Sequence, residues 1–439
     1  MCGEPDDGRR PSPVARRPSP VARRPPPAAR RQPPIMETIR VVIIGAGPAG
    51  LATSRELKER GVEHVVLERG DGVGHTWANL YDSLTLHTGK HMSGLPGMRL
   101  PRSAPLFVPR EQFVQYLRSY AERFALPVRT GWTVTAVERL TGGNDRWRVR
   151  ANTSAGEREI TCVVVVIATG IVANPRMPAI PGADDFQRAG GKLLHSVRYR
   201  APNAFYNKRI LIVGVGNSGG EIAAELARSG NADGKVTPVT IAVRTGANVV
   251  PRDILGIPIQ YLARYIRKLP RKAREAVLRA VGKIVEKRRG PAVLPRPPYG
   301  PLDAIPLIGF SLVDAIRDGL VKTRGGIARL TATGAVFADG KSPAEEPFDV
   351  VILATGFAPA LTLLGQLIRT DAKGFALRRD RIASADHDGL YFVGHNYDAT
   401  GGLFNIARDA RLLAQRIAEA DSSDRGRPPR PITEHSQTA

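Results

Sequence analysis

Two glycine-rich turns of identical spacing are the residues with the clearest chemistry in this sequence. The first covers residues 45–50 (Gly-Ala-Gly-Pro-Ala-Gly) and the second covers residues 214–219 (Gly-Val-Gly-Asn-Ser-Gly). Glycines at this spacing permit a tight turn and let a pyrophosphate approach the backbone, where the positive end of a following helix stabilises its charge. The candidate cofactor-binding residues of the turns are Gly45, Ala46, Gly47, Pro48, Ala49 and Gly50, then Gly214, Val215, Gly216, Asn217, Ser218 and Gly219.

The residue that ends the next strand distinguishes the two turns. Glu68 ends the strand after the first turn, where a carboxylate can accept hydrogen bonds from both ribose hydroxyls of a dinucleotide. Arg244 ends the corresponding strand after the second turn. An acid there would repel a 2′-phosphate, whereas an arginine can pair with it, so the second site is predicted to bind NADPH. An ordinary exposed arginine is the alternative interpretation of Arg244, and Arg252 is a second candidate for the phosphate.

Side chains in the second turn have two interpretations. Asn217 and Ser218 can hydrogen-bond the phosphates of NADPH, or they can simply cap the helix that follows.

Two dinucleotide sites of opposite charge preference predict an electron relay between a tightly bound flavin and a nicotinamide donor. The flavin would do the redox chemistry, while the protein positions the two rings and controls access of water.

A disulfide reductase is the first rival within the same broad fold, and cysteine content argues against it. That class needs a redox-active cysteine pair, but the sequence has only Cys2 and Cys162, which are far apart. The same count excludes a disulfide framework and a cysteine zinc cluster, and no metal site is predicted. A reducing, cytoplasmic location is the simplest interpretation.

The elements that must position these residues alternate between strands and helices. Residues 40–69 read as a strand, the first turn, a helix and a second strand, and another such unit begins at Lys208. This order predicts an α/β protein with two Rossmann-like dinucleotide-binding domains, the NADPH domain being inserted into the FAD domain. Residues 128–140 and 146–153 read as consecutive antiparallel strands, and two apolar strands end alike in Ala-Thr-Gly. We expect the FAD domain at 36–190 and 350–420, the NADPH domain at 191–349, and a basic helical insertion at about 255–306 within it.

Charge and apolar content bound the remaining possibilities. The 439 residues are 42% hydrophobic, and the longest apolar run, 162–173, is too short to span a membrane.

The basic charge is concentrated in part at the start of the sequence. The net charge of the whole sequence is +23, and the proline-rich residues 1–35 contain eight arginines. That segment has no periodic apolar residues, so it is predicted to be a disordered tail, as is 421–439. Residues 1–35 also read as an upstream extension with a natural start at Met36, or as an anion-binding arm. No apolar segment follows the arginines, which argues against a secretory signal.

A second basic stretch lies between Arg264 and Gly300, with twelve basic and two acidic residues. Helical spacing places Ala273, Val277 and Val281 on one face together with Ile284, which predicts an amphipathic helix with a solvated basic face. A weak membrane-surface association stays open as an alternative. Nucleic-acid binding is not expected, because no aromatic residues interleave with the charge. The oligomeric state is not predicted.

Taken together, these motifs resemble those of the flavin-containing monooxygenases. The local matches include "HTWANLYDSLTLHT", "VGVGNSGGEIA", "VVPRDILG" and "ATGFAP", and they are most similar to the plant indole-3-pyruvate monooxygenase (YUCCA-like) branch. The family's linker signature is matched by Gly191, His195 and Tyr199, with Ala189 in its phenylalanine position. The resemblance extends from about residue 40 to residue 420.

The resemblance implies a mechanism and roles for individual residues. NADPH would reduce FAD, and O₂ would then form a C4a-(hydro)peroxyflavin that oxygenates a small organic substrate. In the plant branch this substrate is a 2-oxo acid, which undergoes oxidative decarboxylation. The resemblance places Trp77 against the flavin ring and His87 near its reactive edge, as catalytic and cofactor-binding candidates, although a loop or core histidine is the alternative for His87. His195 and Tyr199 are expected to brace the interdomain linker.

Other activities remain open at this point. N- or S-oxygenation of a soft nucleophile is compatible with the same motifs. A Baeyer–Villiger enzyme would be favoured by Trp at Tyr199 and Phe at Ala189, and neither occurs. A flavin-bound NADPH oxidase or redox sensor without a dedicated substrate is the alternative from another class.

Overall fold

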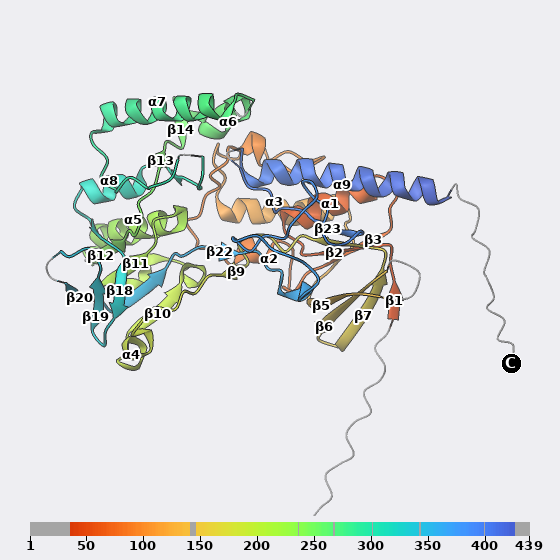
Figure 1. The fold of residues 1–439 in the computed structure, drawn as a ribbon, viewed down its shortest axis with the longest axis horizontal. Coiled ribbons are helices and arrows are strands. Elements are labelled where there is room, and N and C mark those ends of the chain that lie inside the picture. Colours follow the sequence, from red (N-terminus) through yellow and green to blue (C-terminus); the bar gives the residue numbers. More distant parts are fainter. Residues whose placement is uncertain are drawn as a thin grey trace, which may run out of the picture. The chain divides into compact units, whose positions relative to one another are not determined.

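The computed structural model describes residues 36–140, 146–235, 237–266, 268–300, 302–341, 344–398 and 400–425. The predicted tail at 1–35 lies outside the described residues, as do residues 426–439. The described chain is an α/β protein built on two parallel five-stranded sheets, which confirms the predicted fold class (Figure 1).

The first parallel sheet holds the first glycine turn. Its order is β23-β8-β2-β3-β4, and every pairing is parallel. Strands β2 and β8 are VVII and VVVI with every residue buried, as expected for strands covered on both faces. Helix α1 packs against α9, and both lie over the sheet with α3 in Figure 1. The bounds are β2 Val41–Ile44, β3 His64–Leu67, β4 Val128–Arg129, β8 Val164–Ile167, β23 Leu390–Phe392, α1 Pro48–Lys58, α3 Arg110–Arg123 and α9 Gly402–Arg425.

A smaller sheet of order β1-β7-β6-β5 accompanies the first. The pairs β5–β6 and β6–β7 are antiparallel, which confirms the prediction for the first of them. Trp147 on β6 is 1% exposed and packs in a cluster with residues of the parallel sheet, so the two sheets share one core. The bounds are β1 Met36–Thr38, β5 Thr133–Arg139, β6 Trp147–Thr153 and β7 Gly156–Cys162.

The second parallel sheet holds the second glycine turn. Its order is β10-β21-β11-β12-β17, again with parallel pairing throughout. Helices α5 and α8 pack together beside it, while α4 and the three-stranded sheet β18-β19-β20 lie against its other side. The bounds are β10 Lys192–His195, β11 Ile210–Val213, β12 Val239–Ala242, β17 Val321–Arg324, β21 Val350–Leu353, β18 Ile327–Leu330, β19 Gly334–Phe337, β20 Glu345–Pro347, α4 Ala183–Arg188, α5 Asn217–Ala232 and α8 Ser311–Arg317.

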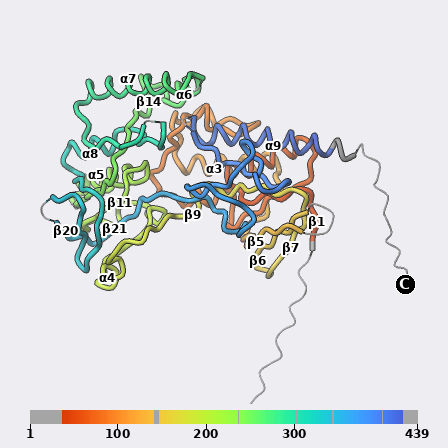
Figure 2. Tube along the Cα trace, in the orientation of Figure 1, coloured from red at the N-terminus to blue at the C-terminus, as the bar shows by residue number. Residues whose placement is uncertain are grey.

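The predicted domain boundaries at 190/191 and 349/350 need correction. Residues 350–353 were predicted to begin the second part of the FAD domain, but they form β21, which pairs between β10 and β11 in the second sheet. Phe186 on α4 packs with Leu211 and Val351, so α4 also belongs to the second core. The inserted domain therefore runs between two short strands, β9 (Asn174–Pro175) and β22 (Phe357–Ala358), which pair antiparallel where the chain crosses between the sheets. Figure 1 labels both strands, and Figure 2 shows the chain trace at β9 in the same orientation.

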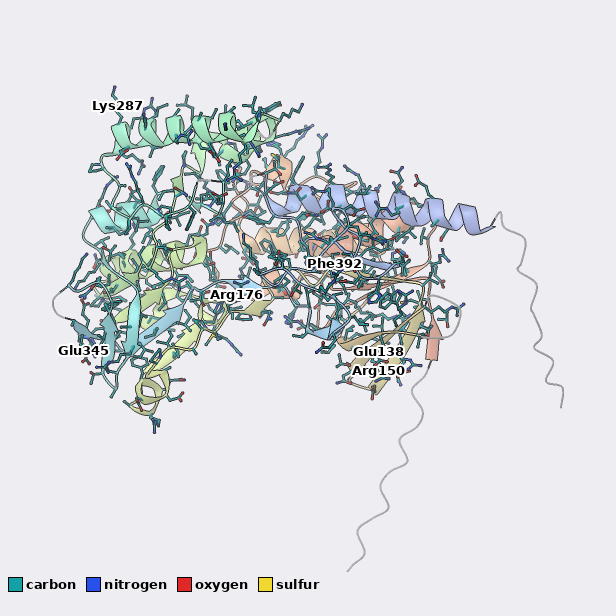
Figure 3. All side chains as sticks on the ribbon, viewed as in Figure 1. Glu138, Arg150, Arg176, Lys287, Glu345 and Phe392 are labelled. Atoms are coloured by element: carbon teal, nitrogen blue, oxygen red, sulfur yellow. The ribbon has the colours of Figure 1, made fainter. Side chains whose placement is uncertain are left out.

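The predicted basic insertion forms helices α6 (Ile259–Ile266) and α7 (Arg271–Arg289). None of the described side chains of α7 is buried, and Lys287 projects away from the molecule (Figure 3). Helix α9 continues to Arg425, past the predicted end of the fold at residue 420. Across the described ranges, no helix combines the length and the apolar character that a membrane crossing requires.

Candidate cofactor and oxygenation site

The three glycines of the first turn are required for different structural reasons. Gly45 has φ 107°, and a Cβ there would lie 2.7 Å from the carbonyl oxygen of Ala168. A Cβ at Gly50 would lie 1.8 Å from the carbonyl oxygen of Gly45, whereas one at Gly47 would meet nothing within 4 Å. The outer glycines are therefore required by the fold itself, and the middle glycine leaves room at the N-terminus of α1, where anions bind.

Glu68 is held in place by the turn it faces. Its side chain is 7% exposed, and its Oε2 accepts a hydrogen bond of 2.7 Å from the backbone N–H of Ala46. Its Oε1 accepts one of 2.9 Å from Gly70. A carboxylate offers about four lone-pair sites, so two hydrogen bonds leave acceptor capacity for ribose hydroxyls.

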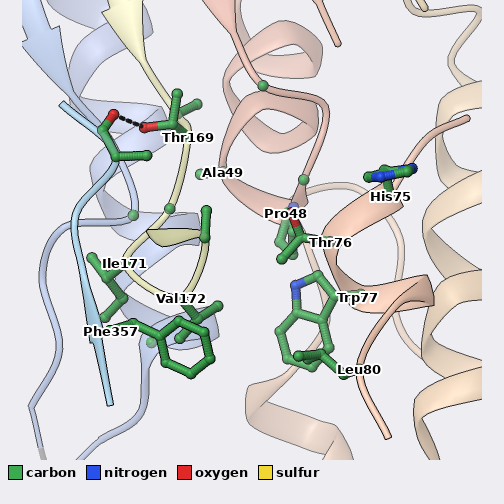
Figure 4. A pocket seen from close by; sticks show the side chains of 18 of the residues that line it. Pro48, Ala49, His75, Thr76, Trp77, Leu80, Thr169, Ile171, Val172 and Phe357 are labelled. Atoms are coloured by element: carbon green, nitrogen blue, oxygen red, sulfur yellow. Dashed lines mark hydrogen bonds between the residues drawn. The ribbon is translucent and has the colours of Figure 1, made fainter. Parts of the chain in front are cut away.

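A cavity of about 680 Å³ extends from the first turn toward the second domain. Trp77 and His87 both line it, together with Glu68 and residues of the first turn. Trp77 comes from the short helix α2 (His75–Ala78), and its ring packs edge-on against Phe113, with ring centroids 4.8 Å apart. Figure 4 shows Trp77 and Leu80 on one side of the cavity and Ile171, Val172 and Phe357 on the other.

The second turn repeats the geometry of the first. Gly214 has φ 107°, and a Cβ there would lie 2.6 Å from the carbonyl oxygen of Ala354. A Cβ at Gly219 would lie 2.1 Å from the oxygen of Gly214, and one at Gly216 would meet nothing within 4 Å. Of this turn only Ser218 lines the cavity. Arg244 is exposed just beyond β12, outside the cavity, and pairs with no carboxylate among the described residues.

Two side chains that were expected to meet the NADPH phosphates are engaged elsewhere. The Asn217 amide donates to the carbonyl of Pro306 at 3.2 Å and accepts from the N–H of Ile308 at 2.7 Å. Asn217 can therefore bind a phosphate only through its backbone N–H, which lies in the first turn of α5. Arg252 donates to Thr85 Oγ1 at 2.6 Å and to the carbonyl of Leu86 at 2.9 Å, so it ties the inserted domain to the segment before His87.

His87 is joined to the second domain through a carboxylate. Its Nε2 lies 2.6 Å from Oε1 of Glu221 on α5, and the hydroxyl of Tyr81 donates to Oε2 of the same group. Burial alone would raise the pKa of Glu221, but hydrogen bonds from His87 and Tyr81 and the charge of Arg252 bring it below its usual value. Burial and the Glu221 charge raise the pKa of Tyr81 well above its usual value, so Tyr81 stays a donor.

The two Ala-Thr-Gly strand ends brace the crossing between the domains. Thr169 donates to the carbonyl of Ala360 at 3.0 Å, and Thr355 donates to that of Arg176 at 2.6 Å, so each strand end is bonded to the connecting segment that follows the other strand end. His195 Nε2 lies 3.0 Å from the carbonyl oxygen of Gly356. Burial lowers the pKa of His195, so its ring is neutral and Nε2–H is the donor.

The residues present fit a flavin dinucleotide and a nicotinamide dinucleotide. The open space at Gly47 and at Gly216 lies in each case in front of a helix N-terminus, where a pyrophosphate binds. A buried histidine, His395, follows Gly394, which lines the cavity beside Ala49. Both ring nitrogens of His395 lack a hydrogen-bond partner among the described residues.

Sequence reasoning missed Glu221 and Tyr81, which connect His87 to α5. Glu221 lies 134 residues from His87 in the sequence and one turn into an ordinary amphipathic helix. Local spacing contains no signal for such a pair. The one local feature is position, because Glu221 is a carboxylate two residues after the second glycine turn.

Comparison with known proteins agrees with this geometry. Residues 38–377 match the family described as "Flavin-binding monooxygenase-like". The chain is 35% identical over 390 residues to indole-3-pyruvate monooxygenase YUCCA1 of Oryza sativa subsp. japonica (86% of this chain, 90% of that protein). It is 32% identical to YUCCA6 of Arabidopsis thaliana over 87% and 91% of the two chains.

Solved structures show the same fold. The flavin-containing monooxygenase from Stenotrophomonas maltophilia superposes with a TM-score of 0.65 at 25% identity, covering 88% of this chain and 100% of that one. Cyclohexanone monooxygenase superposes with a TM-score of 0.67 at 19% identity, covering 88% of each chain, which is a likeness of fold alone. On the family match and these relatives, the chain belongs to the flavin-binding monooxygenase-like family.

Proposed function

We propose that this flavin monooxygenase binds FAD at the first turn and NADPH at the second, and oxygenates a small 2-oxo acid with loss of CO₂. The observation that carries the cofactor assignment is the opposite charge at the two strand ends, Glu68 and Arg244, behind turns of matching geometry. The substrate class is suggested by relatives named indole-3-pyruvate monooxygenases.

The reaction balances with one molecule each of NADPH and O₂. A 2-oxo acid, NADPH, H⁺ and O₂ give the carboxylic acid shortened by one carbon, CO₂, H₂O and NADP⁺. One oxygen atom enters the acid and the other leaves as water. The bound flavin supplies the electron transfer and the reaction with O₂.

The chain's own residues supply binding and exclusion of water. Glu68 and the start of α1 hold the dinucleotide, and Arg244 pairs with the 2′-phosphate of NADPH. The apolar walls formed by Trp77 and Leu80, and opposite them Val172 and Phe357, suit a planar, largely apolar substrate body (Figure 4). His87 is a titratable side chain that lines the cavity and contacts Glu221 of the second domain, where it can bind or exchange a proton.

The test compares substrates in the FAD-loaded, full-length protein. Indole-3-pyruvate, phenylpyruvate, an alkylamine and an alkyl sulfide are each added while NADPH consumption, oxygenated product and H₂O₂ are measured. We expect the aromatic 2-oxo acids to stimulate NADPH consumption with about one product per NADPH. Product from the amine or sulfide alone would replace the 2-oxo acid with N- or S-oxygenation. Equal peroxide and NADPH with every substrate would mean that the enzyme is an NADPH oxidase.

A further inference from the structure

The contact between His87 and Glu221 joins two regions that the fold brings together from separate domains. His87 belongs to the segment after α2 in the first domain, while Glu221 lies on α5, which begins within the second glycine turn. Their 2.6 Å separation is that of a charge-assisted hydrogen bond. The pair is therefore present only when α5 lies against the segment that carries His87.

The contact also fixes which nitrogen of His87 carries a proton. An ionised carboxylate is an acceptor only, so the nitrogen facing it must be an N–H. Tyr81 donates to the second oxygen of Glu221, and the guanidinium of Arg252 lies close enough to favour the charged carboxylate. Both partners thus keep Glu221 an acceptor, and Nε2 of His87 is the donor.

The other ring nitrogen, Nδ1, has no hydrogen-bond partner among the described residues, and the side chain lines the cavity. In the neutral ring, a proton on Nε2 leaves Nδ1 as a free acceptor. We propose that Glu221 is a positioning residue that holds His87 in the Nε2–H tautomer, so that Nδ1 accepts a proton from a group in the cavity and returns it.

The proposal deepens the function proposed above and rests on it for the identity of the group in the cavity. The step itself is a proton transfer alone: the lone pair of Nδ1 takes the proton, and the Nε2–H bond to Glu221 stabilises the resulting imidazolium. Return of the proton restores the neutral ring. No electron is exchanged with the protein.

The matched control is on the same helix. Glu225 lies one turn further along α5 and accepts a hydrogen bond of 2.8 Å from the hydroxyl of Tyr199, without contacting His87. Glu225→Gln therefore makes the same chemical change at a neighbouring site. Glu221→Gln keeps the shape of the side chain but can donate as well as accept, so it no longer imposes one tautomer on His87.

The first measurement does not depend on catalysis. Ring ¹⁵N shifts of histidine-labelled, FAD-loaded full-length protein report the tautomer, and loss of one signal set in His87→Gln assigns His87. We expect the Nε2–H pattern in the wild type and in Glu225→Gln, and a mixture or the Nδ1–H form in Glu221→Gln. An unchanged Nε2–H pattern in Glu221→Gln would overturn the proposal. Should that variant fail to retain FAD, Glu221→Asp, whose shorter side chain loses the bond, is read in the same way.

The second measurement separates positioning from simple domain attachment. In Glu221→Gln we expect peroxide formed per NADPH to rise at least threefold and its pH dependence to flatten, while the KM for NADPH stays within twofold. A raised KM with unchanged coupling would instead make Glu221 a domain contact and refute the role. A wild type that makes only peroxide would defeat the proposed function, and the tautomer measurement would still decide the inference.

Discussion

The two glycine turns have nearly the same backbone and very different surroundings. Gly45 and Gly214 share φ 107°, and each packs against an Ala-Thr-Gly strand end at about the same distance. The strand-end residues differ: Glu68 is 7% exposed and bonded to the turn, whereas Arg244 is exposed and outside the cavity. A buried, preorganised acceptor suits a resident cofactor, and an exposed cation suits a co-substrate that must leave after each turnover.

The largest expected effect tests whether both turns are equally constrained. An alanine at Gly50 or at Gly219 would place a Cβ 1.8 Å or 2.1 Å from a backbone oxygen, so the turn must open. We expect each change to destabilise the protein by roughly 3 kcal/mol or more, since backbone cannot yield as a side chain can. Thermal unfolding of the two variants measures this, with Gly47→Ala and Gly216→Ala as controls that meet no atom within 4 Å.

The two control variants, Gly47→Ala and Gly216→Ala, should themselves differ in which cofactor they fail to bind. Gly47→Ala should fold and lose FAD, and Gly216→Ala should keep its FAD and show a raised KM for NADPH. Loss of FAD in Gly216→Ala would contradict the division of the cofactors between the turns.

The next effect tests the charge at the second strand end. Arg244→Ala should raise the KM for NADPH by about ten- to a hundredfold, because a charged hydrogen bond contributes about 1.5–3 kcal/mol. The KM for NADH should change less than twofold, since NADH has no 2′-phosphate. Steady-state kinetics with both nucleotides measures the ratio, and Arg244→Lys should recover part of it. A similar loss with both nucleotides would leave Arg244 as a surface residue.

A smaller effect tests the first strand end. Glu68→Gln replaces one acceptor oxygen with an amide, so a buried backbone N–H of Ala46 or Gly70 loses its partner. The amide also leaves one acceptor fewer for the ribose hydroxyls, so FAD binding should weaken by about 1–3 kcal/mol. Titration of FAD into the apoprotein measures it, and the KM for NADPH should not change. A raised KM for NADPH in Glu68→Gln would show that Glu68 also affects the second nucleotide site.

The smallest effect concerns His395, a buried histidine of the first domain. Burial, followed by the charge of Arg378, lowers the pKa of His395 from 6.5 to about 3. The unfolded chain therefore binds a proton that the folded chain does not, and stability present above pH 6.5 is lost as the pH falls toward 3. His395→Phe should flatten the fall of Tm between pH 6.5 and pH 4. An equal slope in wild type and variant would remove His395 from the acid response.

Local sequence patterns predicted the parts of the fold that local physics determines. The apolar runs VVII and VVVI had to be buried strands, and the glycine spacing required a turn and a helix after them. The patterns failed where distant segments compete. Strand β21 carries the same ending as β8, and only its pairing with β10 and β11 shows to which sheet it belongs.

The residues of the candidate site also differ in whether local sequence or a distant contact determines their role. Glu68 was predicted from its place after the first glycine turn and Trp77 from the family resemblance, and both line the cavity. Asn217 was predicted to meet a phosphate, but its amide is bound by the strand before α8, a contact 89 and 91 residues away in the sequence. Glu221 escaped prediction for the same reason, because its role is defined by a partner in the other domain.

The crossing strands β9 and β22 have a consequence for engineering. The inserted domain enters and leaves the first domain through two strands that pair with each other, so its two ends are neighbours. A segment with adjacent ends can be removed and its ends rejoined, or replaced by another nucleotide-binding unit, without cutting a strand of the sheet that holds Glu68. The inserted domain, where we propose that NADPH binds, is in that sense an exchangeable unit.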